Sequence, residues 1–478
     1  MIALRRTSLH RAAIAVMLGC LAGCATVDFD QALQEANQAT RDLTQGTLEL
    51  SRGDAQRQAR LKASDQLLAQ PLSMSDAVQL ALANSPALQA MLAESWADLA
   101  LASQRGRIAN PLLTFERMRL GEELEIGRLL SFGLLDVLTL PQRQAVARIH
   151  GEQARTKLAA NVVEHVGQVR QAWIRAVAAG QSVAYAQQVQ RAAQASGELA
   201  RQMQQVGNFT RLQRARQQSF YADATTRLAL AQQAASGTRE ELVRQLGLDD
   251  AQAARLTLPE RLPELPGVPL TAQQVGALGA AQRLDVQLAR QQLAVADKAQ
   301  ALVVLGSLID VDLGLRHDSV FDNAAPSKAS RNGFEIDLRL PLFDPGDARR
   351  AAQSAQSLAA LNRYEGVLRA ALSQLRQSYS AYRTAFDIAR HYRDEVLPLR
   401  KLMAEENLLR YNGMLIGVFE LLADTRDQIA SVIAAIDAQQ QFWLADAALA
   451  ASVLGKPTLS AMTPVAAGAA TGAADPAH

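Results

Sequence analysis

Hydrophobic residues recur at alternating spacings of four and three in the second half of the chain. The run comprises Leu368, Leu372, Leu375, Tyr379, Tyr382, Phe386 and Ala389. This heptad pattern predicts a long helix that packs against other helices along one face. In the first half, no proline occurs between Gln142 and Leu258, where Ala, Gln, Arg and Leu dominate. That composition predicts helices of about 60 residues, far longer than ordinary globular helices.

Segments with a different period separate these helices. Apolar and polar residues alternate over 309–316 and 335–340, and less regularly over 112–119 and 125–138. A period of two predicts strands with one apolar and one polar face. The connections within the two strand pairs, which would face outward in a membrane protein, are expected at 121–124 and 322–332.

Two environments suit such strands. In a soluble protein the apolar face would cover a core, whereas in an outer-membrane barrel it would face lipid and the charged face would line a wet lumen. The high frequency of charge favours the barrel, with Ile309, Val311, Ile336 and Leu338 toward lipid. The expected lumen residues are Asp310, Asp312, Glu335, Asp337 and Arg339.

Three features recur in the same order at offsets of 198, 200 and 206 residues. They are a helix start, a strand end and a glycine within a helical stretch: Leu72 and Leu270, Leu140-Pro141 and Leu340-Pro341, Gly207 and Gly413. Recurrence of this kind predicts an internal two-fold repeat. The first copy would occupy 71–258 and the second 270–456, joined over 259–269 by a proline-rich linker that cannot be helical.

The N-terminal residues have the pattern of a secretory signal. Arg5, Arg6 and Arg11 are followed by an apolar stretch over 12–18, which is too short to span a bilayer. The tetrapeptide Leu21-Ala22-Gly23-Cys24 is similar to the bacterial lipobox, so residues 1–23 are expected to be cleaved and Cys24 to carry a covalent lipid. An ordinary signal peptide that ends near a cysteine remains an alternative.

Cysteine usage favours the lipid. The chain contains only Cys20 and Cys24, so cleavage would leave one thiol in an oxidising compartment unless it were acylated. Ala25 stands where an aspartate would signal retention in the inner membrane, which predicts an outer-membrane location. The lipid-anchored segment 24–70 has helical character of its own, and the Ala-, Gly- and Pro-rich tail over 457–478 is predicted to be disordered.

Composition argues against nucleic-acid binding and catalysis. Lys and Arg number 49 against 47 Asp and Glu, with no basic stripe. None of the six histidines is spaced from another histidine or a cysteine as in a metal site, and no phosphate loop or nucleophile motif occurs. We therefore expect no enzyme activity, no metal and no cofactor apart from the lipid. His165 and His391 are interpreted as packed or solvated helix residues.

The ordered motifs from about residue 70 to about 455 resemble those of the TolC-type outer-membrane efflux proteins. The segment Pro341-Leu342-Phe343-Asp344-Pro345-Gly346 is close to that family's PLFDxG motif. The duplicated helix starts and the turns over 207–212 and 411–416 add to the likeness. The resemblance implies a mainly α protein with membrane β structure. Three protomers would each give four strands to one barrel, and their helices would continue it as a periplasmic tunnel.

The resemblance also implies a function and partners. The protein would be the passive exit duct of a tripartite efflux or type I secretion system, a homotrimer in outer-membrane lipid that meets a periplasmic adaptor and an inner-membrane pump. A lipid-anchored coiled-coil adaptor and a structural envelope lipoprotein are the alternatives. The duplicated order of helix, strands and long helices argues against the first, and the charged strands argue against the second.

In that family the tunnel narrows near the turns that here contain Gly207 and Gly413, and acids beyond the second turn line the aperture. Counting from Tyr411 places Glu420 at the acidic position, whereas counting from Gly413 places Phe419 there. Asp424 shares a helical face with Glu420. From the equivalent turn of the first repeat, two basic residues are expected to pair with these acids in the closed state: Arg211 and Arg214. A solvated stripe of charge is the alternative.

Overall fold

The computed structural model describes residues 28–121, 123–277, 283–306, 310–322, 327–340 and 342–455. Contacts divide these residues into two compact units. Unit 1 takes 28–36, 94–155 and 297–354, and unit 2 takes 37–93, 156–296 and 355–455. The predicted tail over 457–478, the lipid attachment residue Cys24 and the residues Ile309 and Pro341 lie outside the described part of the chain.

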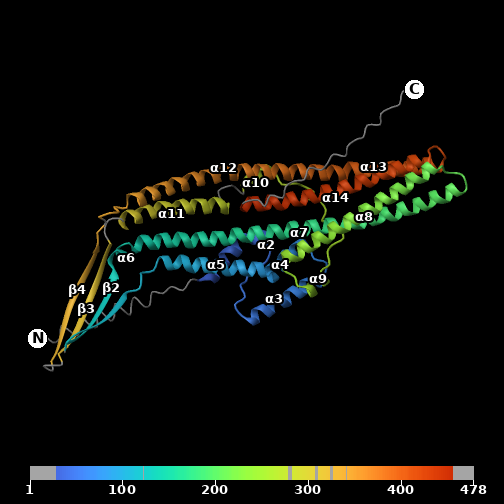
Figure 1. The fold of residues 1–478 in the computed structure, drawn as a ribbon. Helices are drawn as coiled ribbons and strands as arrows, with labels where there is room; N and C mark the ends of the chain where they lie inside the picture. The colour runs from blue at the N-terminus through green and yellow to red at the C-terminus, as the bar shows by residue number, and fades with distance from the viewer. Residues whose placement is uncertain are drawn as a thin grey trace. The chain divides into compact units, whose positions relative to one another are not determined.

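Helices make up most of the chain (Figure 1). Four strands form the sheet of unit 1: β1 Leu112–Leu120, β2 Glu123–Gly133, β3 Asp310–Asp322 and β4 Ser327–Arg339. The helices, in chain order, are α2 Phe29–Thr44, α3 Asp54–Leu67, α4 Met74–Asn84, α5 Pro86–Arg105, α6 Leu134–Leu138, α7 Leu140–Gln205, α8 Arg211–Leu246, α9 Asp250–Arg255, α10 Ala272–Ala277, α11 Leu284–Gly306, α12 Asp347–His391, the π-helical turn η2 Tyr392–Val396, α13 Leu397–Asn412 and α14 Val418–Leu454.

The sheet is antiparallel throughout, in the order β1-β2-β3-β4. Strand pairs from the two halves of the sequence therefore join at the contact between β2 and β3. Side chains that face each other across these ladders share one side of the sheet. Register thus assigns every described strand residue to one of two faces.

The strand predicted over 125–138 is wrong at its C-terminal end. The strand β2 stops at Gly133, and Leu134–Leu138 form α6 instead. The reason is local, because Leu134, Leu135, Val137 and Leu138 do not alternate with polar residues. The ion pair of Asp136 with Arg143, at 2.7 Å, links α6 to the start of α7. Since α7 begins at Leu140, Pro141 lies in the first turn of a helix and does not follow a strand directly.

The outward loop predicted over 322–332 is wrong over 327–332, whereas residues 323–326 lie outside the described part of the chain. The strand β3 continues to Asp322 and β4 begins at Ser327, and pairing extends to that last pair. Polar residues such as Arg331 and Asn332 occupy both faces in this part of β4, so the sequence carries no apolar alternation there. Backbone pairing with β3 nevertheless continues, because it does not depend on side-chain polarity.

The two halves of the chain start their helices in the same way. Ser73 caps α4 by accepting a bond from the Asp76 backbone, and Thr271 accepts one from Gln274 before α10. The indole of Trp173 donates to the Leu72 carbonyl at 2.8 Å, and the Tyr382 hydroxyl accepts from the Leu270 amide at 3.2 Å. An aromatic residue of each half's long helix thus fixes the position at which that half begins.

The core of unit 2 contains most of the predicted heptad run. Leu375, Tyr382, Phe386 and Ala389 are buried, and Phe442 of α14 contacts the rings of Tyr382 and Phe386. Leu372 is a departure, because 44% of its surface is exposed. At the end of the run, Pro398 lacks an amide hydrogen, and the π-helical turn η2 precedes it, which accommodates the missing helical bond.

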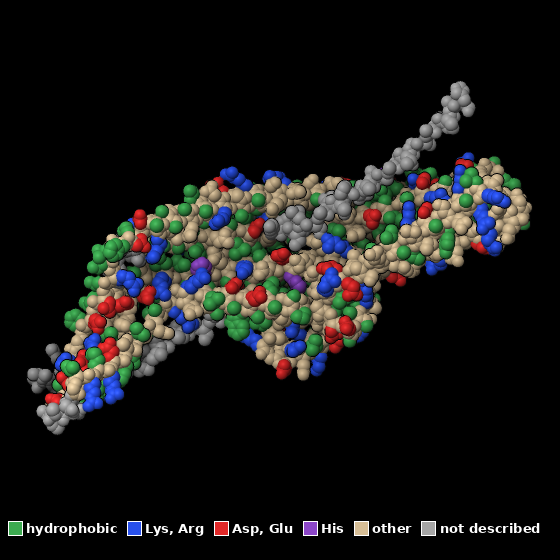
Figure 2. Space-filling view, viewed as in Figure 1, with side chains coloured by type: hydrophobic (Ala, Val, Ile, Leu, Met, Phe, Trp, Pro, Cys, Tyr) green, Lys and Arg blue, Asp and Glu red, His purple; other side chains and the backbone are tan. Residues whose placement is uncertain are grey.

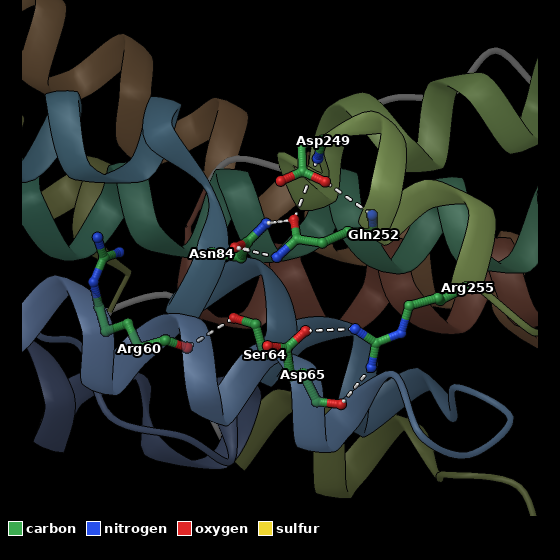
Figure 3. A network of polar contacts seen from close by, with 7 residues as sticks. All are labelled: Arg60, Ser64, Asp65, Asn84, Asp249, Gln252 and Arg255. Carbon is green, nitrogen blue, oxygen red and sulfur yellow. Dashed lines mark hydrogen bonds and ion pairs between the residues drawn. The ribbon is translucent and has the colours of Figure 1, made fainter.

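A polar network holds α4 against the α8–α9 junction of unit 2 (Figure 3). The Asn84 amide donates to the Gly247 carbonyl at 2.8 Å and to Gln252 at 3.1 Å. Gly247 has a φ of +66° and approaches Ser85 and Pro86 so closely that a Cβ would lie 2.5 Å from Pro86 Cδ. Only glycine combines this backbone conformation with so little space.

Candidate functional site

One face of the sheet is rich in charge. Register places Asp312, Glu335, Asp337 and Arg339 on it together, as the alternation predicts. The backbone of Asp310 pairs with that of Arg339. Figure 2 shows acidic and basic side chains close together on the side of the sheet turned to the viewer.

Arg316 is the centre of this face. Its guanidinium lies 3.0 Å from Asp318, 3.1 Å from Glu116 and 3.7 Å from Glu335. These three acids come from β3, β1 and β4, so one cation ties three strands together. Because the Arg316 side chain is about a third exposed, its ion pairs orient the side chains of the three strands more than they add to the stability of the fold.

The acids on this face outnumber the cations. Register adds Glu123, Glu125 and Asp322 to the acids already named, whereas the basic residues are Arg316, Arg331 and Arg339. Arg331 lies 4.0 Å from Glu125. A surface with this excess of acids would attract cations.

The sequence pattern missed part of the charged face. Arg316 belongs to the recognised alternation, but Asp318 lies beyond the predicted strand end and Glu116 lies in the less regular first strand. Gly127 of β2 also lies on the charged face, but a glycine has no side chain whose polarity could indicate the face. Its pairing with Glu116 and Asp318 leaves an open space through which Arg316 crosses β2.

The second candidate site lies at two turns of unit 2, one that connects α7 to α8 and one that connects α13 to α14. Between α7 and α8, Gly207 has a φ of +81°, and the Asn208 amide donates to the Met203 carbonyl. Thr210 and Gln213 form a reciprocal capping box at the start of α8. In the second turn the left-handed residue is Met414, with a φ of +58°, and not Gly413, whose φ is −79°.

The predicted aperture residues lie next to these turns. Glu420 is exposed in the first turn of α14, where the helix dipole favours an acid, and Asp424 is half-buried one turn later. Arg211 and Arg214 are exposed at the start of α8. Figure 2 shows basic side chains gathered on the visible face near the α7–α8 turn.

The described residues contain no ion pair between these arginines and these acids. Arg214 donates to Gln204 at 2.9 Å instead. The contact between α8 and α14 is made by Arg426, which lies 4.5 Å from the Phe220 ring and donates to the Arg216 carbonyl. The aperture assignment therefore stays a prediction, and Arg426 is an additional residue that the motif did not indicate.

Titratable groups are also buried within the helices of unit 2. Burial lowers the pKa of His165, whose Nε2 has no hydrogen-bond partner in the described structure. Burial raises the pKa of Asp446, an effect that Arg170 partly opposes. His391, by contrast, is exposed and lies 3.2 Å from Glu395.

The described residues contain neither a membrane-spanning helix nor a metal-binding cluster. No helix among them is both long and apolar enough to cross a bilayer. No cluster of three or more His, Cys, Asp or Glu side chains in the same residues has a metal-binding arrangement.

The sequence matches no protein-family model and no curated protein, but several solved structures match the fold. A membrane protein from Pseudomonas aeruginosa has a TM-score of 0.66 and 18% identity, over 84% of this chain and 94% of that one. The CmeC outer membrane channel of Campylobacter jejuni has a TM-score of 0.67 and 12% identity, over 80% and 85%. The open MtrE outer membrane channel of Neisseria gonorrhoeae has a TM-score of 0.63 and 15% identity, over 81% and 91%.

These similarities establish the fold. The chain is a mainly helical protein with a small antiparallel sheet, similar to TolC-type channels. The mainly helical fold with a small sheet, expected from the ordered motifs, is thereby confirmed, whereas the trimer and the shared barrel stay predictions.

Proposed function

We propose, from the fold that this chain shares with TolC-type outer-membrane channels, that it is the passive exit duct of a tripartite efflux or type I secretion system. The observation that carries the proposal is the two-faced sheet, in which the acidic residues lie on one face and an apolar zone extends across all four strands on the other. Such a sheet suits a barrel wall between lipid and water. No catalytic role is proposed for any residue.

The sheet also suggests a homotrimer. Among the strands described in one protomer, β1 and β4 each pair with only one other strand, so both carry unpaired backbone groups along one edge. Such edges are not tolerated in hydrocarbon, where no water replaces the missing hydrogen bonds. Three protomers, each giving four strands, would close the barrel and remove the edges.

The charged face would then line the lumen. Its excess of acids over Arg316, Arg331 and Arg339 predicts a preference for cations over anions in small-ion permeation. Glu420 and Asp424 would add a second acidic ring at the periplasmic end. Selection of the transported compound would fall mainly to the pump, with which the duct would connect through a periplasmic adaptor.

We further propose that the mature protein begins at Cys24 and is held in the outer membrane by a covalent lipid on that residue. The support is the Leu21-Ala22-Gly23-Cys24 sequence and Ala25 after it. Labelling cells with radioactive palmitate should mark the native protein and leave Cys24→Ala unlabelled. Label of equal intensity on the Cys24→Ala protein would overturn the anchor and leave the channel proposal intact.

The alternatives predict different assemblies. An adaptor would have a single helical hairpin, whereas this chain has one between α7 and α8 and another between α13 and α14. A structural lipoprotein would have no need of a charged face inside a membrane sheet.

Extraction of outer membranes in mild detergent tests the proposal. We expect a trimer that migrates as one species without heating and as a monomer after boiling, and that conducts ions when added to planar bilayers. A monomeric species without conductance would overturn the duct and favour the adaptor or the structural lipoprotein.

A further inference from the structure

The face of the sheet opposite the charged one is divided into two zones. The first zone is wholly apolar, and the register aligns its residues in rows across the strands. These residues are Leu113, Leu130, Phe132, Val311, Leu313, Leu315, Phe334, Ile336 and Leu338. Many of them are exposed, including Phe334 at 78% and Leu113 at 68%.

The second zone lies nearer the strand connections and is basic. One row contains Phe115, Arg128, His317 and Asn332; the next contains Arg117, Ile126, Ser319 and Ser330; the last contains Arg119, Leu124, Phe321 and Lys328. We call Arg117, Arg119, Arg128 and Lys328 the basic girdle. All are exposed. The hydrogen bond between His317 and Asn332 corroborates that these rows share a face.

This face lacks acidic residues. None of the strand positions that the register assigns to it, from Leu113 to Leu338, is Asp or Glu. Arg119 donates to the Gly121 carbonyl, and Lys328 lies 5.6 Å from the Phe321 ring. The acids of the sheet point to the other side, so the girdle has no carboxylate partner within the described sheet.

The two zones have the spacing of a membrane interface. At about 3.4 Å per residue, the apolar zone of β4 extends about 14 Å along the strand from Phe334 to Leu338. Beyond the end of β4, the exposed Leu340, Leu342 and Phe343 continue the apolar residues toward the helical end, where the rest of the apolar band of an outer-membrane barrel would lie. The girdle begins where this band ends, at the side of the strand connections.

We propose that the basic girdle binds the phosphate groups of phosphorylated lipid head groups in the outer leaflet; this inference rests on the proposed function, because it requires the apolar zone to face lipid. Guanidinium groups match phosphate oxygens with two parallel hydrogen bonds. The interspersed Phe115, Leu124, Ile126 and Phe321 provide contacts for the acyl chains near the head groups. Charge complementarity and continuity with the apolar zone select a lipid over a soluble anion.

Titration of the full-length trimer in detergent with fluorescent bis-phosphorylated lipid A tests the inference. Each cation near an anionic lipid surface contributes about a fivefold change in binding. Arg117→Gln with Arg128→Gln should therefore weaken binding about 25-fold, and the same positions changed to Lys should restore most of it. The matched control is Arg331→Gln with Arg339→Gln, which removes the same charge from the opposite face and should change binding less than about twofold.

Phosphate-free lipid A provides the chemical control and should bind the native protein and the girdle variant equally weakly. Equal weakening by the girdle and control variants would overturn the inference, as would native binding that does not depend on the phosphates. Trimer yield and bilayer conductance are measured in the same preparations. A native protein that fails to form a conducting trimer overturns the proposed function itself, whereas a conducting trimer whose girdle variant binds lipid A normally overturns only the girdle.

Discussion

The guanidinium of Arg316 lies 3.1 Å from the carboxylate of Glu116, across the intervening strand β2. The contact is possible because Gly127 pairs with Glu116 on one side and with Asp318 on the other. A Cβ at Gly127 would lie 3.2 Å from Asp318 Oδ1 and 3.5 Å from the Arg316 guanidinium. The first and second halves of the sequence are thus joined in one sheet by an ion pair that needs a residue without a side chain.

Gly127→Val should disrupt this arrangement. Its two methyl groups would occupy the space through which Arg316 reaches Glu116, which would separate the ion pair or push β2 out of register. We expect the heat-resistant trimer to fall severalfold in outer-membrane extracts. Gly333→Val is the matched control, since Gly333 also pairs with the Arg316 row but a Cβ there meets nothing within 4 Å. Similar losses in both variants would show that valine harms any position of the sheet.

Much of the fold follows from periodicity. The four strands, the helices of the heptad run and both helical turns have patterns that a single sequence reveals, because burial on one face imposes a period of two or 3.6. Strand ends were less predictable. Residues 327–332 pair with β3 through their backbone while their side chains are polar on both faces, so no hydrophobic signal marks them.

The sequence predicts the residue types of the candidate site better than the contacts between them. Asp312, Glu335 and Asp337 alternate with apolar neighbours and could be assigned to one face. The role of Gly127 depends on which residues lie opposite it on β1 and β3, and that register joins segments about 200 residues apart. The contact of Arg426 with Phe220 likewise depends on how α8 packs against α14, which no local motif specifies.

Leu338→Arg should block assembly more than Arg339→Leu. Leu338 belongs to the apolar zone and Arg339 to the charged face, although they are adjacent in sequence. An arginine on the lipid face costs roughly 2 to 4 kcal/mol near the bilayer midplane, whereas a leucine on the lumen face removes one of several charges. Trimer yield after detergent extraction measures the difference. Equal yields would contradict the assignment of the two faces.

The aperture prediction concerns permeation and not assembly. Glu420→Gln combined with Asp424→Asn should weaken cation selectivity, because it removes negative potential from the narrowest part of the proposed tunnel. Charge reversal at Arg211 or Arg214 should raise resting conductance if these residues hold the closed state. Reversal potentials and conductance in planar bilayers provide both readouts. Native values in all these variants would place the aperture elsewhere.

The buried His165 predicts a pH dependence of stability. Burial lowers its pKa below the ordinary value of 6.5, so the unfolded chain binds a proton that the folded protein resists. The free energy of unfolding should therefore fall as pH drops below about 6.5. His165→Gln should reduce the loss of Tm between about pH 7.5 and about pH 5.5, relative to the native protein.

His391→Gln is the control for that measurement, because His391 is exposed on α12 and lies beside Glu395. Asp446 acts in the opposite direction, since its raised pKa favours the folded state on acidification, and the comparison must therefore be made with Asp446 intact. A loss of Tm that is the same in His165→Gln and in the native protein would exclude His165 as its source.

Accessibility of two adjacent residues, measured during conduction, tests the central claim that the charged face of the sheet lines an open duct. Asp337→Cys and Leu338→Cys would each be placed in the trimer and treated with a charged methanethiosulfonate in planar bilayers. In the proposed mature protein Cys20 is removed with residues 1–23 and Cys24 is acylated, so the introduced cysteine provides the free thiol. The account predicts that the reagent lowers the conductance of Asp337→Cys within seconds and leaves Leu338→Cys unchanged. A reagent effect on Leu338→Cys alone, or a native trimer that does not conduct, would contradict it.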